Sequence, residues 1–579
     1  MNRLIITSFL SLLSLMVYAQ QPKDTLNTEV INVVKPYTPT ISDAFKVNDH
    51  PIISNETVEK EPIGYQINSV PVASTFTPSK GKVKGVARPK KERLFDNYIS
   101  AGFGNYTTPL IEAYMRTFPN RDSEFGVLLK HHSSQGGIKD IVLDDSFYDS
   151  ALDLYYKSGT RDMDWSINFG AQHQLYNWYG LSEGTSYDAS LLENIDPKQT
   201  YLNIGIGGEI EYFDSFFKGA KAKISSLGDN FKSGELRARI QPTFEMPISS
   251  EIINFQFDLD YLNGNFDRNY ANSSAITYSY LNFGVTPNFE VLRDNLSINL
   301  GAKLYYAVDI ENSNSEFKAY PNVDASYQLV EEVLTVFAGA TGGLNYNTFL
   351  DLSQDNSFIS PNLYSVPTDE KYRAFAGLKG KLASNMNYLL RGSFADERSK
   401  PLQVLNQIKT DGTDIMPVNE PYELGNSFGV LYDDVKTLSL YGELAIDFSK
   451  EFTFGGSVNY ASYSLENQIE AWNLPNLKTT LFADYHANKW TGAAKLFMLG
   501  ERKDFEMPYL LPLLYNIEDY IVEMGAYLDL NAEISYAFTN RLSAFAKGNN
   551  LLGTKYKRFH NYPVQGLQVL GGITYKFDL

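Results

Sequence analysis

From Asn97 to the C-terminus, apolar and polar residues alternate with a period of two in one segment after another. The clearest examples of this alternation are residues 201–212, 253–261, 296–306 and 528–538. Successive side chains of a β-strand point to opposite faces of the sheet, so each segment predicts a strand with one apolar and one polar face. Such a sheet has either lipid outside and water inside, as in a membrane barrel, or one dry face, as in a soluble sandwich.

The connections between these segments favour the membrane barrel, because short and long ones alternate. The short ones lie at residues 159–162, 292–295, 330–332, 384–387, 449–451, 487–489 and 539–541, and the long ones near 132–148, 179–199, 345–369, 397–424 and 501–525. Bacterial outer-membrane barrels have an even number of strands, short periplasmic turns and longer outer loops. We therefore predict an all-β fold, a transmembrane antiparallel β-barrel of about 22 strands over residues 95–579. The strand number includes a hairpin near 213–230 and one long strand over 424–448.

Residues 1–19 have the layout of a secretory signal peptide. Arg3 gives a positive start, an apolar run extends from Leu4 to Val17, and Ala19 is a small residue at the cleavage position. The alternative, a membrane anchor, would need a longer apolar run. We expect Sec-type export, cleavage near Ala19, and a mature chain in the outer membrane of a Gram-negative bacterium, in contact with its lipid.

Residues 20–94 differ from everything after them, because they contain eight prolines and little alternation. This composition predicts a short irregular N-terminal segment on the periplasmic side. Its net charge is +3, whereas residues 95–579 carry −22. A basic cluster directly before the first strand contains Lys80, Lys82, Lys84, Arg88, Lys90, Lys91 and Arg93. The basic cluster is either a solvated linker or a segment that docks on an acidic surface, such as the barrel lumen.

The last strand indicates how the barrel closes. Val569, Ile573, Tyr575 and Phe577 form an outward apolar row that ends in aromatic rings, which suit the membrane interface. An open sheet edge in lipid would leave backbone groups unpaired at a cost of several kcal/mol each, so the sheet must be joined edge to edge. We expect the barrel-assembly machinery to pair with this strand during insertion.

Three motifs near the C-terminus resemble the closing hairpin of TonB-dependent receptors. Residues 549–556, 562–566 and 572–577 match that family's Asn-Leu-turn-Tyr segment, Tyr-Pro-x-x-Gly loop and aromatic-ended last strand. The resemblance implies a gated outer-membrane transporter driven by an inner-membrane energy-coupling complex. Family members carry an N-terminal plug domain inside the barrel. Only 75 residues stand between the signal peptide and the barrel here, which is short for an independent core, so the plug is truncated or missing.

Glu29, Val30, Ile31, Val33 and Val34 resemble the energy-coupling box of such receptors. That box is an extended strip that adds as a strand to a TonB-type coupling protein. The same run would also suit a local β-strand or a segment docked in the lumen.

The composition argues against several other kinds of chemistry. The chain has no cysteine, so disulfides and thiolate sites are excluded, and its net charge of −18 disfavours nucleic acid as a partner. His131 and His132 are adjacent and should point to opposite sides of a strand, so we expect no metal site. The pairs Asp144–Asp145 and Asp433–Asp434 should separate in the same way. We expect no enzymatic activity and no cofactor.

Three functions are compatible with these features. The first is uptake of a solute across the outer membrane by a TonB-dependent-receptor-like barrel. The second is a non-transporting subunit or scaffold of an outer-membrane complex, sealed by a surface lipoprotein or another outer-membrane subunit. The third is a passive porin. The apolar run 508–515, in a predicted outer loop, is either an interaction surface or a cover over the barrel mouth.

Overall fold

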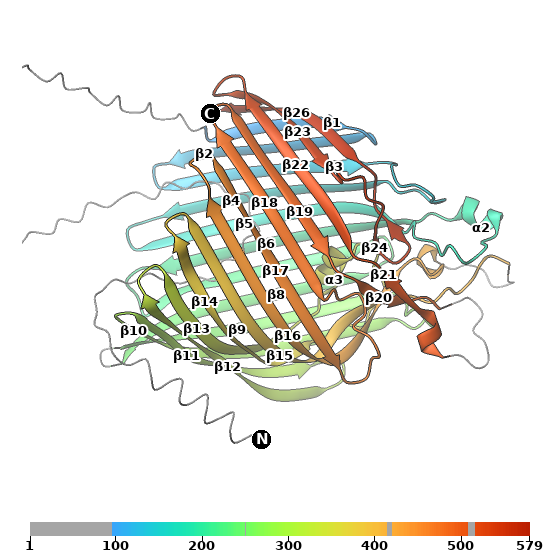
Figure 1. The fold of residues 1–579 in the computed structure, drawn as a ribbon. Helices are drawn as coiled ribbons and strands as arrows, with labels where there is room; N and C mark the ends of the chain where they lie inside the picture. The colour runs from blue at the N-terminus through green and yellow to red at the C-terminus, as the bar shows by residue number, and fades with distance from the viewer. Residues whose placement is uncertain (1–94, 249–250, 414–419, 508–515, 579) are drawn as a thin grey trace, which may run out of the picture. The chain divides into compact units, whose positions relative to one another are not determined.

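The computed structural model describes residues 95–248, 251–413, 420–507 and 516–578. Within them, 22 antiparallel strands form one closed sheet, a β-barrel (Figure 1). The predicted fold class and the predicted number of strands are confirmed. The signal peptide, the coupling strip at 29–34, the basic cluster at 80–93 and the apolar run 508–515 lie outside the described residues, and the predictions about them stay predictions.

The barrel strands follow one another in sequence order around the ring. The first eleven are β1 (Asn97–Gly104), β2 (Thr108–Asn120), β3 (Ser123–Ser134), β4 (Phe147–Gly159), β5 (Met163–Asn177), β6 (Lys198–Tyr212), β7 (Phe217–Asp229), β8 (Gly234–Ile248), β9 (Glu251–Phe266), β10 (Ile276–Arg293) and β11 (Leu296–Asp309). The other eleven are β12 (Asn314–Val330), β13 (Leu334–Asn345), β14 (Thr368–Ala383), β15 (Met386–Leu405), β16 (Phe428–Asp447), β17 (Phe452–Leu465), β18 (Leu477–Ala487), β19 (Trp490–Leu499), β22 (Tyr527–Ala537), β23 (Leu542–Asn549) and β26 (Gln568–Phe577).

The ring closes between the first and the last of these strands. β1 pairs with β2 on one side and with β26 on the other, in a register that runs from Asn97↔Phe577 to Gly104↔Leu570. Every barrel strand therefore has two hydrogen-bonded neighbours, which removes the edge that lipid could not solvate.

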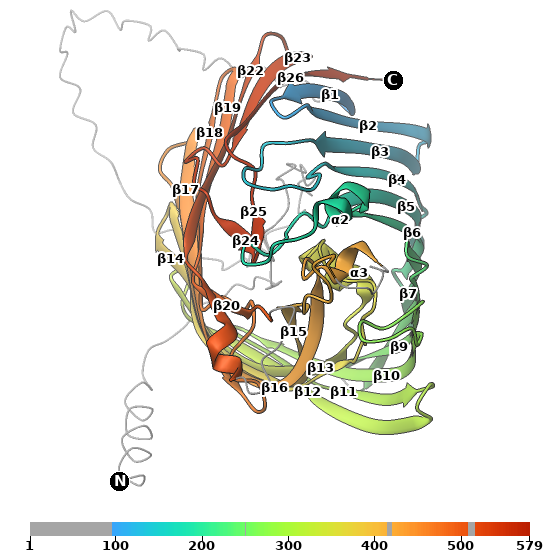
Figure 2. The same cartoon turned by 90° about the vertical axis from the view of Figure 1, so that its right-hand side faces the viewer.

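The two ends of the barrel differ as the sequence predicts. Turns at one end are short. The hairpin predicted near 213–230 corresponds to the turn 213–216 and β7, and the predicted strand over 424–448 is the single strand β16. Long loops at the other end carry the short elements α2 (Ala189–Asn194), α3 (Phe349–Asp355), η1 (Pro421–Glu423), β20 (Arg502–Phe505), η2 (Ile517–Tyr520), β21 (Ile521–Met524), β24 (Lys557–Phe559) and β25 (Tyr562–Pro563). Figure 2, which looks toward the loop end of the barrel, shows α2, α3 and β24 within the outline of the ring, and Figure 1 shows that α2 lies beyond the ends of the strands. Among the described residues, no helix is long and apolar enough to cross a membrane.

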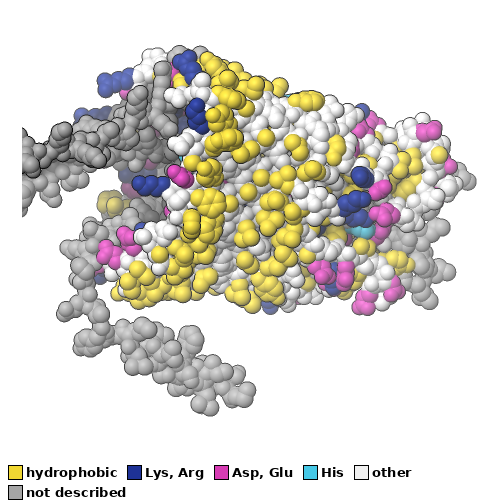
Figure 3. All heavy atoms as spheres, turned by 45° about the horizontal axis from the view of Figure 1, so that its top comes forward, with side chains coloured by type: hydrophobic (Ala, Val, Ile, Leu, Met, Phe, Trp, Pro, Cys, Tyr) yellow, Lys and Arg dark blue, Asp and Glu magenta, His cyan; other side chains and the backbone are white. Residues whose placement is uncertain are grey.

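The outer wall of the barrel is apolar. Exposed apolar side chains point outward from strands all around the ring, such as Ile206 on β6, Leu300 on β11 and Ile534 on β22. Figure 3 shows hydrophobic side chains over the wall and charged ones gathered toward its two ends. Since a soluble monomer does not expose apolar surface of this extent, the wall is suited to lipid.

The strands differ in length. β15 and β16 contain 20 residues each, whereas β1 and β23 contain eight. A tilted strand of about 10 residues crosses the hydrocarbon core of a bilayer, so the loop-side ends of β15 and β16 extend past it. Leu402, Val404 and Phe428, which lie in these ends, are buried.

An arginine placed on the outer wall tests the lipid contact. Leu440 lies in the middle of the outward row Leu438, Leu440 and Leu444 of β16. We expect Leu440→Arg to lower the free energy of unfolding from lipid vesicles by about 2–4 kcal/mol, because a cation near the bilayer midplane loses its hydration. Ser439→Arg is the matched control, because its side chain points into the lumen. Equal urea midpoints for the two variants would contradict the assignment of the wall.

Candidate functional site

The long loops fold inward and bridge the barrel mouth. We call this set of segments the loop lid; its described residues are 135–146, 178–197, 346–367, 406–413, 420–427, 466–476, 500–507, 516–526 and 550–567. Buried apolar side chains of the loop lid and of the adjoining strand ends form three separate hydrophobic cores. The lid is therefore packed like the interior of a globular domain.

The first core fixes α3 against the wall formed by β6 to β10. Phe349 packs edge-on against Tyr201 and Phe266, and all three rings are buried. The buried carboxylate of Glu235 on β8 accepts hydrogen bonds from the backbone N–H of Phe349 (2.6 Å) and Leu350 (3.2 Å). A carboxylate at the start of a helix satisfies amides that have no partner within the helix, so Glu235 anchors this loop in the barrel.

The second core joins four loops through one ring. Tyr562 is fully buried, stacks on Phe358 at 3.7 Å between centroids, and meets Tyr179 edge-on at 4.9 Å. Its hydroxyl donates to the backbone carbonyl of Asn426, and the side-chain amide of Asn426 donates to the carbonyl of Trp178 (2.9 Å). Loops that leave distant strands thus share one packing unit, and Tyr562 is its centre.

The part of the lid around β20 holds two carboxyl groups whose pKa values shift in opposite directions. Asp504 on β20 is fully buried and accepts hydrogen bonds from the backbone N–H of Leu405 (3.1 Å) and from the side-chain amide of Asn473 (2.8 Å). Burial raises the pKa of Asp504 to about 6, although these hydrogen bonds act to lower it. Burial also acts to raise the pKa of Glu506, but hydrogen bonds, first among them that from His560 at 2.8 Å, outweigh it and lower the pKa to about 2.

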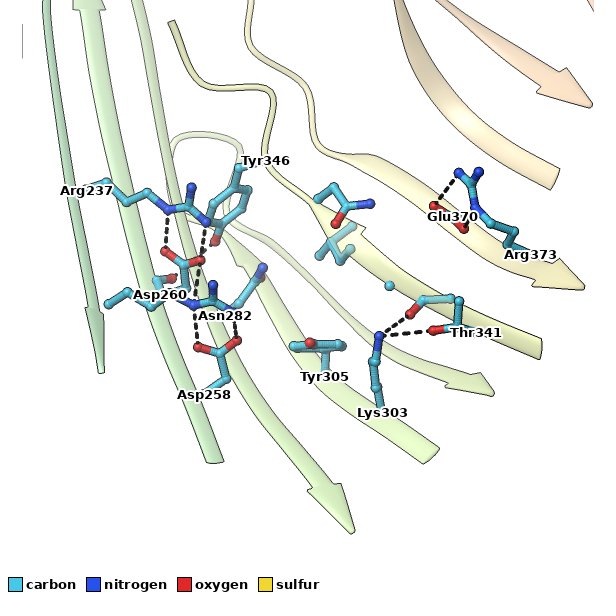
Figure 4. A pocket seen from close by; sticks show the side chains of 15 residues that line it. Arg237, Asp258, Asp260, Asn282, Lys303, Tyr305, Thr341, Tyr346, Glu370 and Arg373 are labelled. Carbon is cyan, nitrogen blue, oxygen red and sulfur yellow. Dashed lines mark hydrogen bonds and ion pairs between the residues drawn. The ribbon is translucent and has the colours of Figure 1, made fainter. Parts of the chain in front are cut away.

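A polar cavity of about 460 Å³ lies on the inner wall, beside the first core (Figure 4). Arg237 and Arg239 of β8 each form a bidentate ion pair with β9, to Asp260 (3.0 and 2.6 Å) and to Asp258 (2.9 and 2.5 Å). Across the cavity, Arg373 of β14 forms a third such pair, with Glu370 (2.8 and 3.2 Å). Bidentate pairs hold both partners in a fixed geometry, so the cavity has rigid polar walls.

The structure places the residues of the last strand on the outer wall. Val569, Ile573 and Tyr575 are each about half exposed, and Phe577 stacks on Tyr575 at 6.0 Å between ring centroids. Phe577 also faces Asn97 across the closing seam. Recognition of this strand by the assembly machinery stays a prediction.

Two of the three candidate pairs of adjacent residues lie in a strand, as expected, and the third does not. His131 bonds to Ser150, whereas His132 packs against Phe147, as expected for opposite faces of β3. Asp433 and Asp434 lie in β16 as expected. The expectation that a strand separates Asp144 from Asp145 is wrong, because β3 ends at Ser134 and β4 begins only at Phe147. In the loop between them, Asp145 accepts from the backbone N–H of Gly136 (2.7 Å).

Several residues of the site were missed by sequence reasoning. Glu235 and Asp504 look like any other polar residues of a strand or loop. The ion pairs between β8 and β9, which we call the ion-pair ladder, left a signal in the sequence. Arg237 and Arg239 stand two apart, and Asp258 and Asp260 stand two apart in the predicted strand 253–261. Opposite charges at the same period in paired strands favour cross-strand ion pairs.

Substitution of Asp504 tests the carboxylate in the lid. The raised pKa means that ionisation costs the folded lid more than the open lid, so lid stability should fall as the pH rises from about 4 to about 6. The total change is at most about 3 kcal/mol, since a tenfold change in an ionisation constant corresponds to about 1.4 kcal/mol. Hydrogen exchange of the lid peptides around β20, corrected for intrinsic rates, should show this fall in the wild type and a smaller fall in Asp504→Asn. Some slope should remain in the variant, because burial also raises the pKa of Asp355 and Glu420. A window from pH 4.5 to 6.5 excludes the effect of Glu506, whose contribution is lost only in stronger acid. Identical slopes in the two proteins would refute the assignment.

Substitution of Tyr562 tests whether the lid keeps the mouth closed. Tyr562→Ala should destabilise the second core by about 3–5 kcal/mol, as expected for removal of a buried aromatic ring. The conductance of the barrel in planar bilayers should then rise. Tyr562→Phe should conduct as the wild type does, because it loses only the hydrogen bond to Asn426, worth about 1 kcal/mol. Tyr575→Ala, on the outer wall, controls for general damage; the prediction fails if Tyr562→Ala conducts no more than this control.

Comparison with known proteins gives matches in structure but not in sequence. No family model matches the chain, and no curated protein matches it. Among solved structures, the pyoverdine outer membrane receptor FpvA from Pseudomonas aeruginosa aligns with a TM-score of 0.58 and 12% identity, covering 85% of this chain and 80% of FpvA. The ferric-catecholate import receptor Fiu from E. coli K12 aligns with a TM-score of 0.59 and 10% identity, covering 84% and 82% of the two chains.

A third similar structure is the copper transporter OprC, with a TM-score of 0.56 and 11% identity over 84% of this chain and 81% of OprC. At these identities the comparison establishes the fold. The resemblance of the C-terminal motifs to TonB-dependent receptors is thereby confirmed at the level of the fold: the described residues form a 22-stranded barrel of the kind these receptors have.

Proposed function

We propose that this protein is a TonB-dependent-receptor-like barrel that takes up a solute across the outer membrane of a Gram-negative bacterium. The observation that carries the proposal is the closed 22-stranded barrel with an apolar outer wall and a polar inner cavity under a loop lid. The similar structures are named as receptors for pyoverdine and ferric catecholates and as a copper transporter, which supports transport rather than catalysis.

The loop lid gives a physical reason for energy coupling. A solute that enters from the loop side must separate segments held by three apolar cores. Breaking such packing costs several kcal/mol for each large side chain, which thermal motion supplies only rarely. We propose that a TonB-type protein supplies this energy by pairing with residues 29–34, through addition of a β-strand.

A second candidate function is a non-transporting subunit of an outer-membrane complex. The feature that favours it is also the lid, because loops that bridge the mouth with their own cores suit a barrel whose lumen need not open. In this case the barrel would bind a partner protein and would not transport a solute. The two functions differ in whether residues 29–34 contact a coupling protein in the cell.

The coupling contact can be tested without knowing the solute. A photoreactive amino acid at Val34 should cross-link to the TonB-type protein in living cells, and Ile31→Pro should reduce the yield at least tenfold, since proline removes a backbone donor from the added strand. Val58→Pro, elsewhere in the N-terminal segment, should have no effect. Absence of the cross-link from a barrel that fractionates with the outer membrane would favour the second candidate.

A further inference from the structure

The polar cavity has the dimensions of a small-molecule site. Its volume of about 460 Å³ lies within the roughly 300–1,000 Å³ that such sites occupy. The lining residues come from β8, β9, β10, β11, β13 and β14 and from the start of the loop after β13. The cavity is thus built mainly on the wall, which holds side chains more rigidly than a loop does.

Three of the four cationic side chains that line this cavity are paired with a carboxylate, and the fourth, Lys303, bonds to neutral oxygen atoms. Arg237, Arg239 and Arg373 each hold a carboxylate in bidentate geometry. A phosphate or carboxylate ligand would have to compete with these carboxylates for the same guanidinium groups. A neutral ligand with hydroxyl groups would not, because paired guanidinium and carboxylate groups keep further donors and acceptors for it.

A flat aromatic ring lies between the ion pairs. Tyr305 lies beside Gly284, and a Cβ atom at that glycine would come within 2.6 Å of the ring atom Cε1. The glycine therefore lets the ring lie against the wall, as Figure 4 shows with the ring edge-on. Tyr320 meets Tyr305 at 5.9 Å between centroids in a T-shaped contact, which fixes the ring from the side.

Lys303 completes this arrangement. Its ammonium group donates to Thr341 Oγ1 (3.2 Å) and to the carbonyl oxygen of Gly342 (3.0 Å). An ammonium group has three donors, so these two contacts orient the group and use two of them. Figure 4 places Lys303 and Tyr305 on neighbouring parts of the cavity wall, between the β8–β9 ladder and the pair Glu370–Arg373.

We propose that this cavity binds a neutral oligosaccharide through one pyranose ring. The apolar face of the sugar stacks on Tyr305, and its equatorial hydroxyl groups bond to the ion pairs on both sides and to Lys303. The inference rests on the proposed uptake function and names its substrate class. An anionic ligand would have to compete with Asp258, Asp260 and Glu370 for the three arginines, and among the described lining residues it would find only Lys303 without a carboxylate partner. The charged walls disfavour an apolar ligand.

Binding to the full chain in detergent micelles tests the proposal. The probes are maltotriose, cellotriose, xylotriose and mannotriose, followed by saturation-transfer NMR and calorimetry. At least one trisaccharide should bind the wild type. Tyr305→Ala should weaken that binding at least tenfold, whereas Tyr305→Phe and Tyr305→Trp should retain it within about threefold, because the ring face and not the hydroxyl makes the contact. Tyr441→Ala, which removes a tyrosine that contacts Arg391 and Glu443 elsewhere on the inner wall, should bind as the wild type does.

Three results would overturn the proposal: no binding of any of the four trisaccharides, binding that Tyr305→Ala leaves unchanged, or competition by inorganic sulfate at millimolar concentration, which would indicate an anion site. Heat-modifiable migration in gels checks that each variant is a folded barrel. The cross-link from Val34, measured on the same protein, separates this inference from the proposed function. A cross-link without sugar binding leaves uptake of another solute, and sugar binding without a cross-link leaves a sugar-binding barrel that is not energised.

Discussion

The structure depends on the pairing of β1 with β26. In lipid there is no water to hydrogen-bond the backbone groups at a sheet edge. The first and last strands must therefore pair with each other, although the whole barrel sequence separates them. The register from Asn97↔Phe577 to Gly104↔Leu570 meets this requirement. Once the ring is closed, one face of every strand must contact lipid and the other must enclose the lumen. The loop lid, the ion-pair ladder and the cavity all depend on this division.

Most of the barrel could be predicted from sequence because its pattern is local. Alternation within residues 253–261 identifies β9 without reference to any other strand, and the short polar turn 292–295 identifies the hairpin of β10 and β11 that it joins. The lid could not be predicted in this way. Phe358, Tyr179 and Tyr562 lie in three loops without periodicity, and their contacts depend on where the closed barrel places those loops.

The candidate site lies between these two cases. The alternation assigns Arg239, Asp258 and Tyr305 to the lumen side of their strands, but it does not reveal their register. That register decides that Arg239 stands opposite Asp260 and binds Asp258, and that Gly284 leaves room for the ring of Tyr305. The mistaken expectation for Asp144 and Asp145 has a related cause, since the end of β3 depends on the loop that follows it. Local pattern gives the face of a residue, and long-range pairing gives its neighbours.

The unequal strands have a consequence for the surrounding bilayer. Two strands near the closing seam, β1 and β23, flank β26 and contain eight residues each. At the usual tilt, eight residues span about 19 Å, less than the roughly 25 Å apolar band of typical outer-membrane barrels. A wall shorter than the hydrocarbon thickness draws the two lipid leaflets together. The acyl chains beside the seam are therefore compressed, and the annulus of lipid is thinner there than beside β15 and β16, which cross the whole hydrocarbon core.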